Sequence, residues 1–231
     1  MKKEFLVVLF TVLFTIINIA AQQNSNPKVI VVTLDGLRWQ ELFSGADSKL
    51  IANNDYVHDS VSLKKQFWRE NNKDRRAVLF PFLWNEVPSM GQIYGNRTFD
   101  NKVNLTNKIR FSYPGYNEIL SGQADDVRIT SNDKLNNPNK TMLEIVNSSS
   151  KFKGKVAAFG SWDVFPFIIN EERSGVPVNA GFENANSDNL SDRELFLNEL
   201  QSQIPSPWGS VRLDAFTHHY ALEYMKKKNQ N

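Results

Sequence analysis

Lys28-Val-Ile-Val-Val-Thr-Leu34, followed directly by Asp35-Gly36, is the stretch that decides the predicted fold. Its apolar, mostly β-branched residues run without polar alternation, which is typical of a strand buried on both faces in a parallel sheet. A second run of this kind, residues 155–159, ends at Gly160-Ser161. Helical patterns lie between and after the two runs. Alternating strands and helices predict an α/β fold.

The helical segments are marked by apolar periodicity and by end signals. Ser191 with Glu194 three residues later forms a capping box, which predicts a helix start. Pro81 and Pro88 interrupt and end another helical pattern. Residues 91–94 predict a short strand, and the Asn-rich residues 131–140 predict a long surface loop. The predicted helices cover residues 38–43, 59–70, 77–87, 116–120, a segment starting at 191, and 214–228.

The composition is that of a globular protein with a sizeable core. Of the 231 residues, 41% are hydrophobic and 23% are charged, so disorder is not expected. The formal net charge is only +2, and Lys226-Lys227-Lys228 is the longest basic block. Nucleic-acid binding is therefore not implied. The sequence has no Cys, which excludes disulfides and a lipid-modified Cys.

The N-terminus has the pattern of a secretory signal. Lys2 and Lys3 precede an apolar run over residues 5–21, which ends in Ala20-Ala21 before a polar stretch. This pattern predicts a signal peptide over residues 1–21. The alternative is a retained membrane anchor, but the run is shorter than the ~20 residues that a spanning helix needs. We therefore expect a secreted or periplasmic protein without a stable membrane anchor after signal removal.

Asp35 is the first candidate site residue. Ligands of open α/β sheets gather at the carboxyl ends of strands, and Asp35 follows the first predicted strand. A carboxylate in this place is a suitable ligand for a divalent cation. The alternative is an N-cap for the helix predicted over residues 38–43. The position alone leaves both interpretations open.

The residues around Asp35, Val-Thr-Leu-Asp-Gly-Leu-Arg-Trp over 32–39, resemble the first metal-binding motif of the alkaline-phosphatase superfamily. The resemblance is to its nucleotide pyrophosphatase/phosphodiesterase branch, in which this Asp holds one of two zinc ions. The resemblance implies a three-layer α/β/α core with a mostly parallel sheet. It also implies that residues 28–231 form the N-terminal part of such a domain, incomplete at its C-terminus.

Ser112 is the second candidate. Phe-Ser-Tyr-Pro-Gly-Tyr over residues 111–116 resembles the family segment that carries the nucleophile before a helix, and Ser112 takes the nucleophile's place and would also contact metal. A hydroxyl at a helix N-terminus beside a divalent cation ionises more readily. The alternative is a plain helix N-cap. Tyr116 stands where sulfatases have Arg, which disfavours sulfatase activity.

Asn132, in Ser131-Asn132-Asp133, resembles the family's Asn that donates its side-chain amide to a phosphate oxygen. The alternative is a turn residue, since Asn is common in loops. Downstream, Trp162 and Asp163 follow the second predicted strand, where they would line a substrate cleft or belong to the core.

The remaining metal ligands of the family are Asp and His residues farther along the chain. This sequence has only 3 His. Asp214 and His218 have a suitable spacing, but their segment is typical of a helix interior with Asp214 as its cap, and no buried strand precedes it. His58 lies in a polar, unpatterned stretch. We therefore expect at most a partial two-zinc site and little or no activity from this polypeptide by itself.

Two functions follow as expectations. The first, which the resemblance implies, is metal-dependent hydrolysis of small phosphate mono- or diesters through a covalent phosphoseryl intermediate on Ser112. The second is a non-catalytic exported domain that binds a ligand and retains the fold. The sequence does not indicate which phosphate ester is the substrate, or whether a monoester or a diester is preferred.

Overall fold

The structure is a computed structural model that describes residues 28–229. The predicted signal peptide, residues 1–21, lies outside the described residues. Helices account for 45% of the structure and strands for only 4%, in one two-stranded parallel sheet. The predicted three-layer α/β/α core is therefore wrong for this structure, which is mostly helical.

Residues 28–34, the stretch on which that prediction rested, form no strand in the structure. They belong to the unit that ends at Arg38, and the described residues from Trp39 onward belong to the second unit. Val29 is 85% exposed and Val31 is 53% exposed, so the run is not buried on either face. A strand needs a neighbouring strand with which its backbone can hydrogen-bond. An apolar pattern indicates that residues can be buried, but it does not provide that neighbouring strand.

Short helices follow Arg38. Asp47, Asp59 and Asn71 cap three of them, each by accepting hydrogen bonds from backbone N–H groups of the first turn. The predicted interruption at Pro81 is confirmed, because one helix ends at Leu79 and the next begins at Pro81. The predicted stop before Pro88 is wrong, because the chain breaks at Glu86 and Pro88 lies in the first turn of a further helix. The helices are α2 (Trp39–Ser44), α3 (Ser48–Ile51), α4 (Ser60–Phe67), α5 (Asn72–Leu79), α6 (Pro81–Asn85) and α7 (Val87–Met90), followed by the 3₁₀ turn η1 (Arg97–Phe99).

Aromatic and arginine side chains hold these helices to one another. Phe43 of α2 packs edge-to-face on Trp84 of α6, with ring centroids 5.8 Å apart. Arg75 of α5 is 9% exposed, lies 4.3 Å from the Trp68 ring, and donates to the carbonyl of Ser44. Arginine stacked on an aromatic face while its donors reach carbonyls suits a small, partly polar core.

The next part of the chain builds the main apolar core. Its elements are α8 (Ser112–Ser121), α9 (Met142–Ser148), β1 (Ala158–Gly160), α10 (Phe165–Ile169), α11 (Glu171–Ser174) and β2 (Val178–Ala180). β1 pairs in parallel with β2, with Phe159 opposite Asn179. Ile168, Ile169 and Val176 are almost fully buried here. The second predicted strand is confirmed in part, since β1 begins at Ala158 and ends at Gly160.

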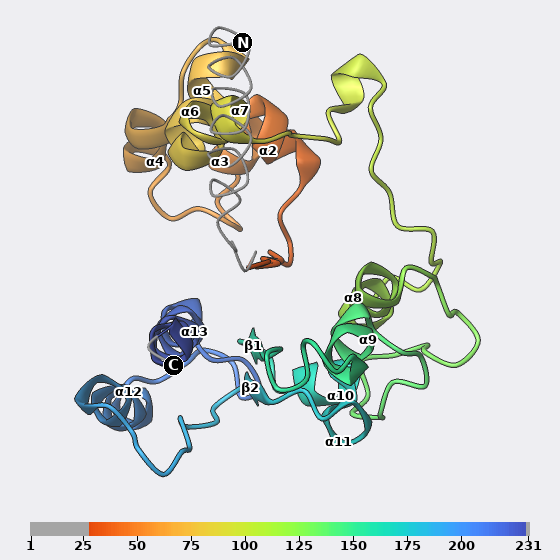
Figure 1. Cartoon of the computed structure of the whole chain (residues 1–231). Helices are drawn as coiled ribbons and strands as arrows, with labels where there is room; N and C mark the ends of the chain where they lie inside the picture. The colour runs from red at the N-terminus through yellow and green to blue at the C-terminus, as the bar shows by residue number, and fades with distance from the viewer. Residues whose placement is uncertain (1–27, 230–231) are drawn as a thin grey trace, which may run out of the picture. The chain divides into compact units, whose positions relative to one another are not determined.

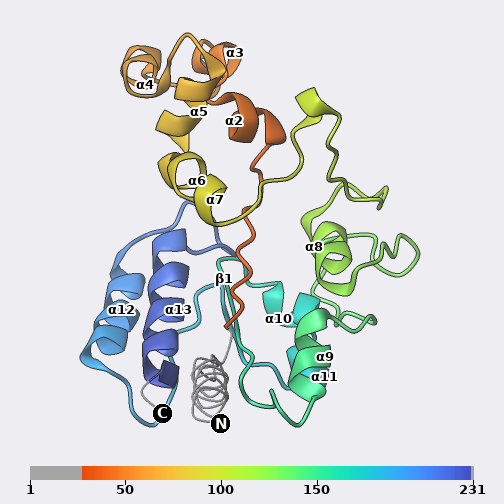
Figure 2. The same cartoon turned by 45° about the horizontal axis from the view of Figure 1, so that its top comes forward.

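Two longer helices end the described chain: α12 (Asp192–Gln203) and α13 (Asp214–Asn229), which lie side by side in Figures 1 and 2. The predicted capping box is confirmed, because Ser191 and Glu194 each accept a hydrogen bond from the other's backbone N–H. Leu197, Phe216 and Tyr220 form a second small core between these helices. Within residues 28–229, no helix has the length and apolarity that a membrane span requires.

Candidate functional site

Ser112 is the first residue of α8, and Phe111 is the N-cap. Phe111 is extended (φ −122°, ψ 159°) and makes no side-chain capping hydrogen bond. The N-cap interpretation of Ser112 is therefore wrong: its hydroxyl stands one position inside the helix, at the positive end of the helix dipole. A hydroxyl placed there is suited to meet an anionic group.

Asn132 supplies the cap that Phe111 lacks. Its Oδ1 accepts a hydrogen bond from the backbone N–H of Tyr113, the residue next to Ser112, over 3.0 Å. Pro114 has no N–H, so the first turn of α8 has few donors to satisfy. Two candidate residues that lie 20 positions apart in the sequence are thus brought to the same helix end.

Tyr113 also holds the segment that carries Asn132. Its side chain is only 2% exposed, and its hydroxyl donates to the carbonyl of Leu135 over 2.7 Å, with the carbonyl of Phe167 at 3.2 Å. Burial raises the pKa of the Tyr113 hydroxyl, which therefore stays protonated and donates at neutral pH.

Three asparagines, Asn117, Asn137 and Asn139, anchor the other end of this loop to the middle of α8; we call them the asparagine cluster. Asn117 Oδ1 accepts from the Nδ2 groups of Asn137 (3.2 Å) and Asn139 (3.1 Å). Asn117 and Asn137 are fully buried and Asn139 is 6% exposed. The prediction of a surface loop over residues 131–140 is confirmed, except that the side chains of Asn137 and Asn139 are buried.

Arg173 closes the network from α11. Its guanidinium donates to Glu144 and to the backbone carbonyls of Asn137 and Asn139, over 2.7–3.2 Å. The Glu144 side chain is nearly buried, whereas that of Arg173 is 35% exposed, so only the carboxylate side of this ion pair is removed from water. The sequence did not predict the asparagine cluster or the role of Arg173. The Asn137-Pro138-Asn139 pattern indicates buried asparagines only once these two side chains are known to point inward.

Glu118 fixes the segment that enters α8. Its two carboxylate oxygens accept from the backbone N–H groups and the side chains of Thr106 and Asn107. Burial on its own would raise the pKa of Glu118, but the hydrogen bonds from Asn107 and Thr106 outweigh it and lower the pKa to about 2. The carboxylate is therefore charged at any physiological pH, and it restrains the chain just before Ser112.

Asp35 lies in the other unit, directly before Gly36, whose φ of +77° is a left-handed turn conformation. The Asp35 residue is exposed. Its predicted role as a metal ligand remains a prediction.

The described residues do not fit a two-zinc centre. Residues 28–229 contain no group of three or more His, Cys, Asp or Glu side chains placed to hold a metal ion. Asp214 instead accepts a hydrogen bond from Ser161, and His218 packs against His219 within α13. The expected helix interior around His218 is confirmed.

Trp162 and Asp163 follow β1, as expected. Trp162 pairs with Val211 in an isolated antiparallel bridge and packs against the main core, which favours the core interpretation. Asp163 forms an ion pair with Lys134 over 2.6 Å. Since Lys134 is two residues from Asn132, this ion pair also restrains the loop that carries Asn132.

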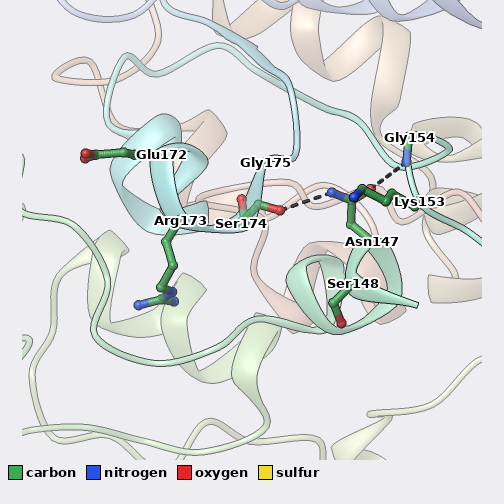
Figure 3. Close-up of a pocket in the computed structure, with 8 residues that line it drawn as sticks. All are labelled: Asn147, Ser148, Lys153, Gly154, Glu172, Arg173, Ser174 and Gly175. Carbon is green, nitrogen blue, oxygen red and sulfur yellow. Dashed lines mark hydrogen bonds between the residues drawn. The ribbon is translucent and has the colours of Figure 1, made fainter. Parts of the chain in front are cut away.

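Two pockets lie elsewhere in the described chain. The smaller, about 350 Å³, is shown in Figure 3, where Asn147 donates to the carbonyl of Ser174 and accepts from the N–H of Gly154. The larger, an open groove of about 1040 Å³, runs beside β1, β2, α12 and α13. Neither is lined by Asp35, Ser112 or Asn132.

No family model matches this sequence, and neither the curated proteins nor the solved structures give a match. The resemblance to the phosphodiesterase branch therefore rests on its motifs, and the site is judged by its own geometry.

Proposed function

We propose that this chain carries the phosphate-binding and nucleophilic segment of an exported phosphohydrolase that acts on small phosphate esters. One observation carries the proposal: Asn132 is bonded to the backbone N–H next to Ser112, at the start of α8. A hydroxyl, a helix N-terminus and a side-chain amide at one point match what a phosphoryl group needs, namely a nucleophile and donors for its oxygens.

The proposed step uses the Ser112 hydroxyl as the attacking group. The bond from Ser112 Oγ to phosphorus forms while the bond from phosphorus to the leaving alcohol breaks, and the hydroxyl proton leaves with the alcohol. Water then hydrolyses the phosphoserine. Because the described residues do not fit two zinc ions, no step is assigned to zinc, and we expect slow or single turnover.

The test is capture of the covalent intermediate. The protein is incubated with p-nitrophenyl phosphate, with and without added Zn²⁺, and then acid-quenched and digested with trypsin. Peptide 111–128 should gain the mass of one phosphoryl group, and fragmentation should place it on Ser112 and not on Ser121. Ser112→Ala should abolish the label, while Ser121→Ala, at the other end of the same helix, should keep it. Equal labelling of Ser112→Ala would remove Ser112 from the mechanism.

A second candidate is a non-catalytic exported binding domain. The lack of a metal-ligand group in residues 28–229 favours it. This candidate predicts no phosphoserine and less than one tightly bound zinc per chain by elemental analysis. Phosphoserine on Ser112 would exclude it.

A further inference from the structure

Tyr113 contacts the Asn132 loop at two points, once through its main chain and once through its side chain. Its N–H donates to Asn132 Oδ1, and its hydroxyl donates to the Leu135 carbonyl three residues later. Its ring is in the main core with Ile129 and Ile168, so both donors come from a rigid, buried residue.

The N–H of Tyr113 also determines which way the Asn132 amide faces. A backbone N–H needs an oxygen as its acceptor, so the Oδ1 of Asn132 must face Tyr113 and the Nδ2 group must lie on the other side of the amide. The hydrogen bonds found among residues 28–229 include none from Asn132 Nδ2. Both Nδ2 hydrogens are then available to an external acceptor such as a phosphate oxygen.

The other anchors of the loop act at a distance from Asn132. The asparagine cluster holds residues 137 and 139, and the Lys134–Asp163 ion pair is partly solvent-exposed. Exposed ion pairs restrain side chains weakly. Tyr113 is therefore the contact that most directly sets the position of Asn132 relative to Ser112.

We infer that Tyr113 is a positioning residue, which holds the Asn132 amide beside Ser112 with its N–H donors turned toward a bound phosphate. This inference rests on the proposed function for its ligand. It assigns Tyr113 no contact with the ligand itself.

The experiment uses ¹⁵N-labelled full chain and four variants: Tyr113→Phe, Asn132→Ala, the double variant, and Tyr220→Phe. Tyr220 is a matched control, because it is also buried (3% exposed) and its hydroxyl donates to Asn198, on α12. Hydrogen exchange of the Tyr113 amide and the Asn132 Nδ2 resonances report the positioning without ligand. Titration with inorganic phosphate reports its consequence.

Tyr113→Phe should shift the Asn132 Nδ2 resonances and speed exchange of the residue-113 amide, whereas Tyr220→Phe should leave both unchanged. Asn132→Ala should weaken phosphate binding about tenfold, the effect of one lost hydrogen bond to an anion. Tyr113→Phe should weaken it by a similar factor, and the double variant should bind no more weakly than Asn132→Ala, because the Tyr113 hydroxyl acts on phosphate only through the Asn132 amide.

The outcomes separate the two proposals. Unchanged exchange and unchanged Nδ2 resonances in Tyr113→Phe would overturn the positioning role, whether or not phosphate binds. Fully additive losses in the double variant would also overturn it, since they would show that Tyr113 acts by another route. Altered Nδ2 resonances in Tyr113→Phe together with no phosphate binding by the unmodified chain would support the positioning of Asn132 and contradict the proposed function.

Discussion

The side-chain oxygen of Asn132 lies 3.0 Å from the backbone nitrogen of Tyr113, so a loop residue caps a helix that begins 20 residues earlier. Caps are usually local, supplied by the residue that precedes the first turn. Here the local position is Phe111, which has no side-chain oxygen. The cap is therefore tertiary, and it couples the stability of α8 to the placement of Asn132.

Because of this coupling, we expect that different substitutions of Asn132 affect the free energy of unfolding and the affinity for phosphate differently. Asn132→Ala should lower the free energy of unfolding by about 1 kcal/mol, the typical value of a lost N-cap. Asn132→Asp should retain most of that stability, because a carboxylate still accepts from the Tyr113 N–H and suits the helix dipole. Urea unfolding measures this. Phosphate binding should fall in both variants; binding by Asn132→Asp at the original affinity would contradict the donor role.

The asparagine cluster should contribute strongly to stability. Asn117→Ala would leave the buried Nδ2 groups of Asn137 and Asn139 without one acceptor, at a cost of about 3 kcal/mol. Asn136→Ala is the matched control: its side chain is exposed and donates to Glu172 at the surface, so its effect should stay within about 0.5 kcal/mol. Equal unfolding midpoints for the two variants in a denaturant titration would show that the network is not a stabilising unit.

The low pKa of Glu118 predicts how the free energy of unfolding changes with pH in the acid range. Its pKa lies at about 2 in the folded chain and at 4.5 in the absence of these contacts, so its contribution is complete above pH 4.5 and declines as the pH falls toward 2. Glu118→Gln should flatten the decrease in unfolding free energy over this interval. Glu199→Gln, an exposed residue of α12, is the control and should follow the parent chain. A Glu118→Gln curve parallel to the parent would argue against the four-donor arrangement.

Gly160 at the end of β1 should tolerate no side chain. A Cβ there would lie 2.4 Å from the Phe165 ring, so Gly160→Ala must displace α10 or rotate the ring, at a cost of about 1–3 kcal/mol. At Gly209 an added Cβ meets nothing within 4 Å, so Gly209→Ala should be close to neutral. Thermal unfolding of the pair checks this, and equal melting temperatures would contradict the close packing.

The elements that were predicted correctly depend on local signals. Ser191 and Glu194 mark the start of α12 because a capping box involves residues three apart. Gly122 ends α8 in a left-handed conformation, with φ +78°, for a similarly local reason. The predicted strand at residues 28–34 failed because strand formation depends on a partner distant in sequence. The burial of Asn137 was missed because an Asn-rich segment is usually a solvated loop.

The sequence by itself determined the ends of α2 and α13, the starts of α4 and α12 and the end of α8, and it singled out Ser112 and Asn132 as chemically notable residues. Where a helix end is set by contacts within a few residues, as at Ser191 and Gly122, the sequence displays those contacts directly. Only the tertiary structure decided that the chain is mostly helical, that Phe111 and not Ser112 is the N-cap of α8, and that Asn132 supplies the missing cap. Those facts depend on side chains and backbone groups that meet only after the chain has folded, since their separation in sequence carries no record of their distance in space.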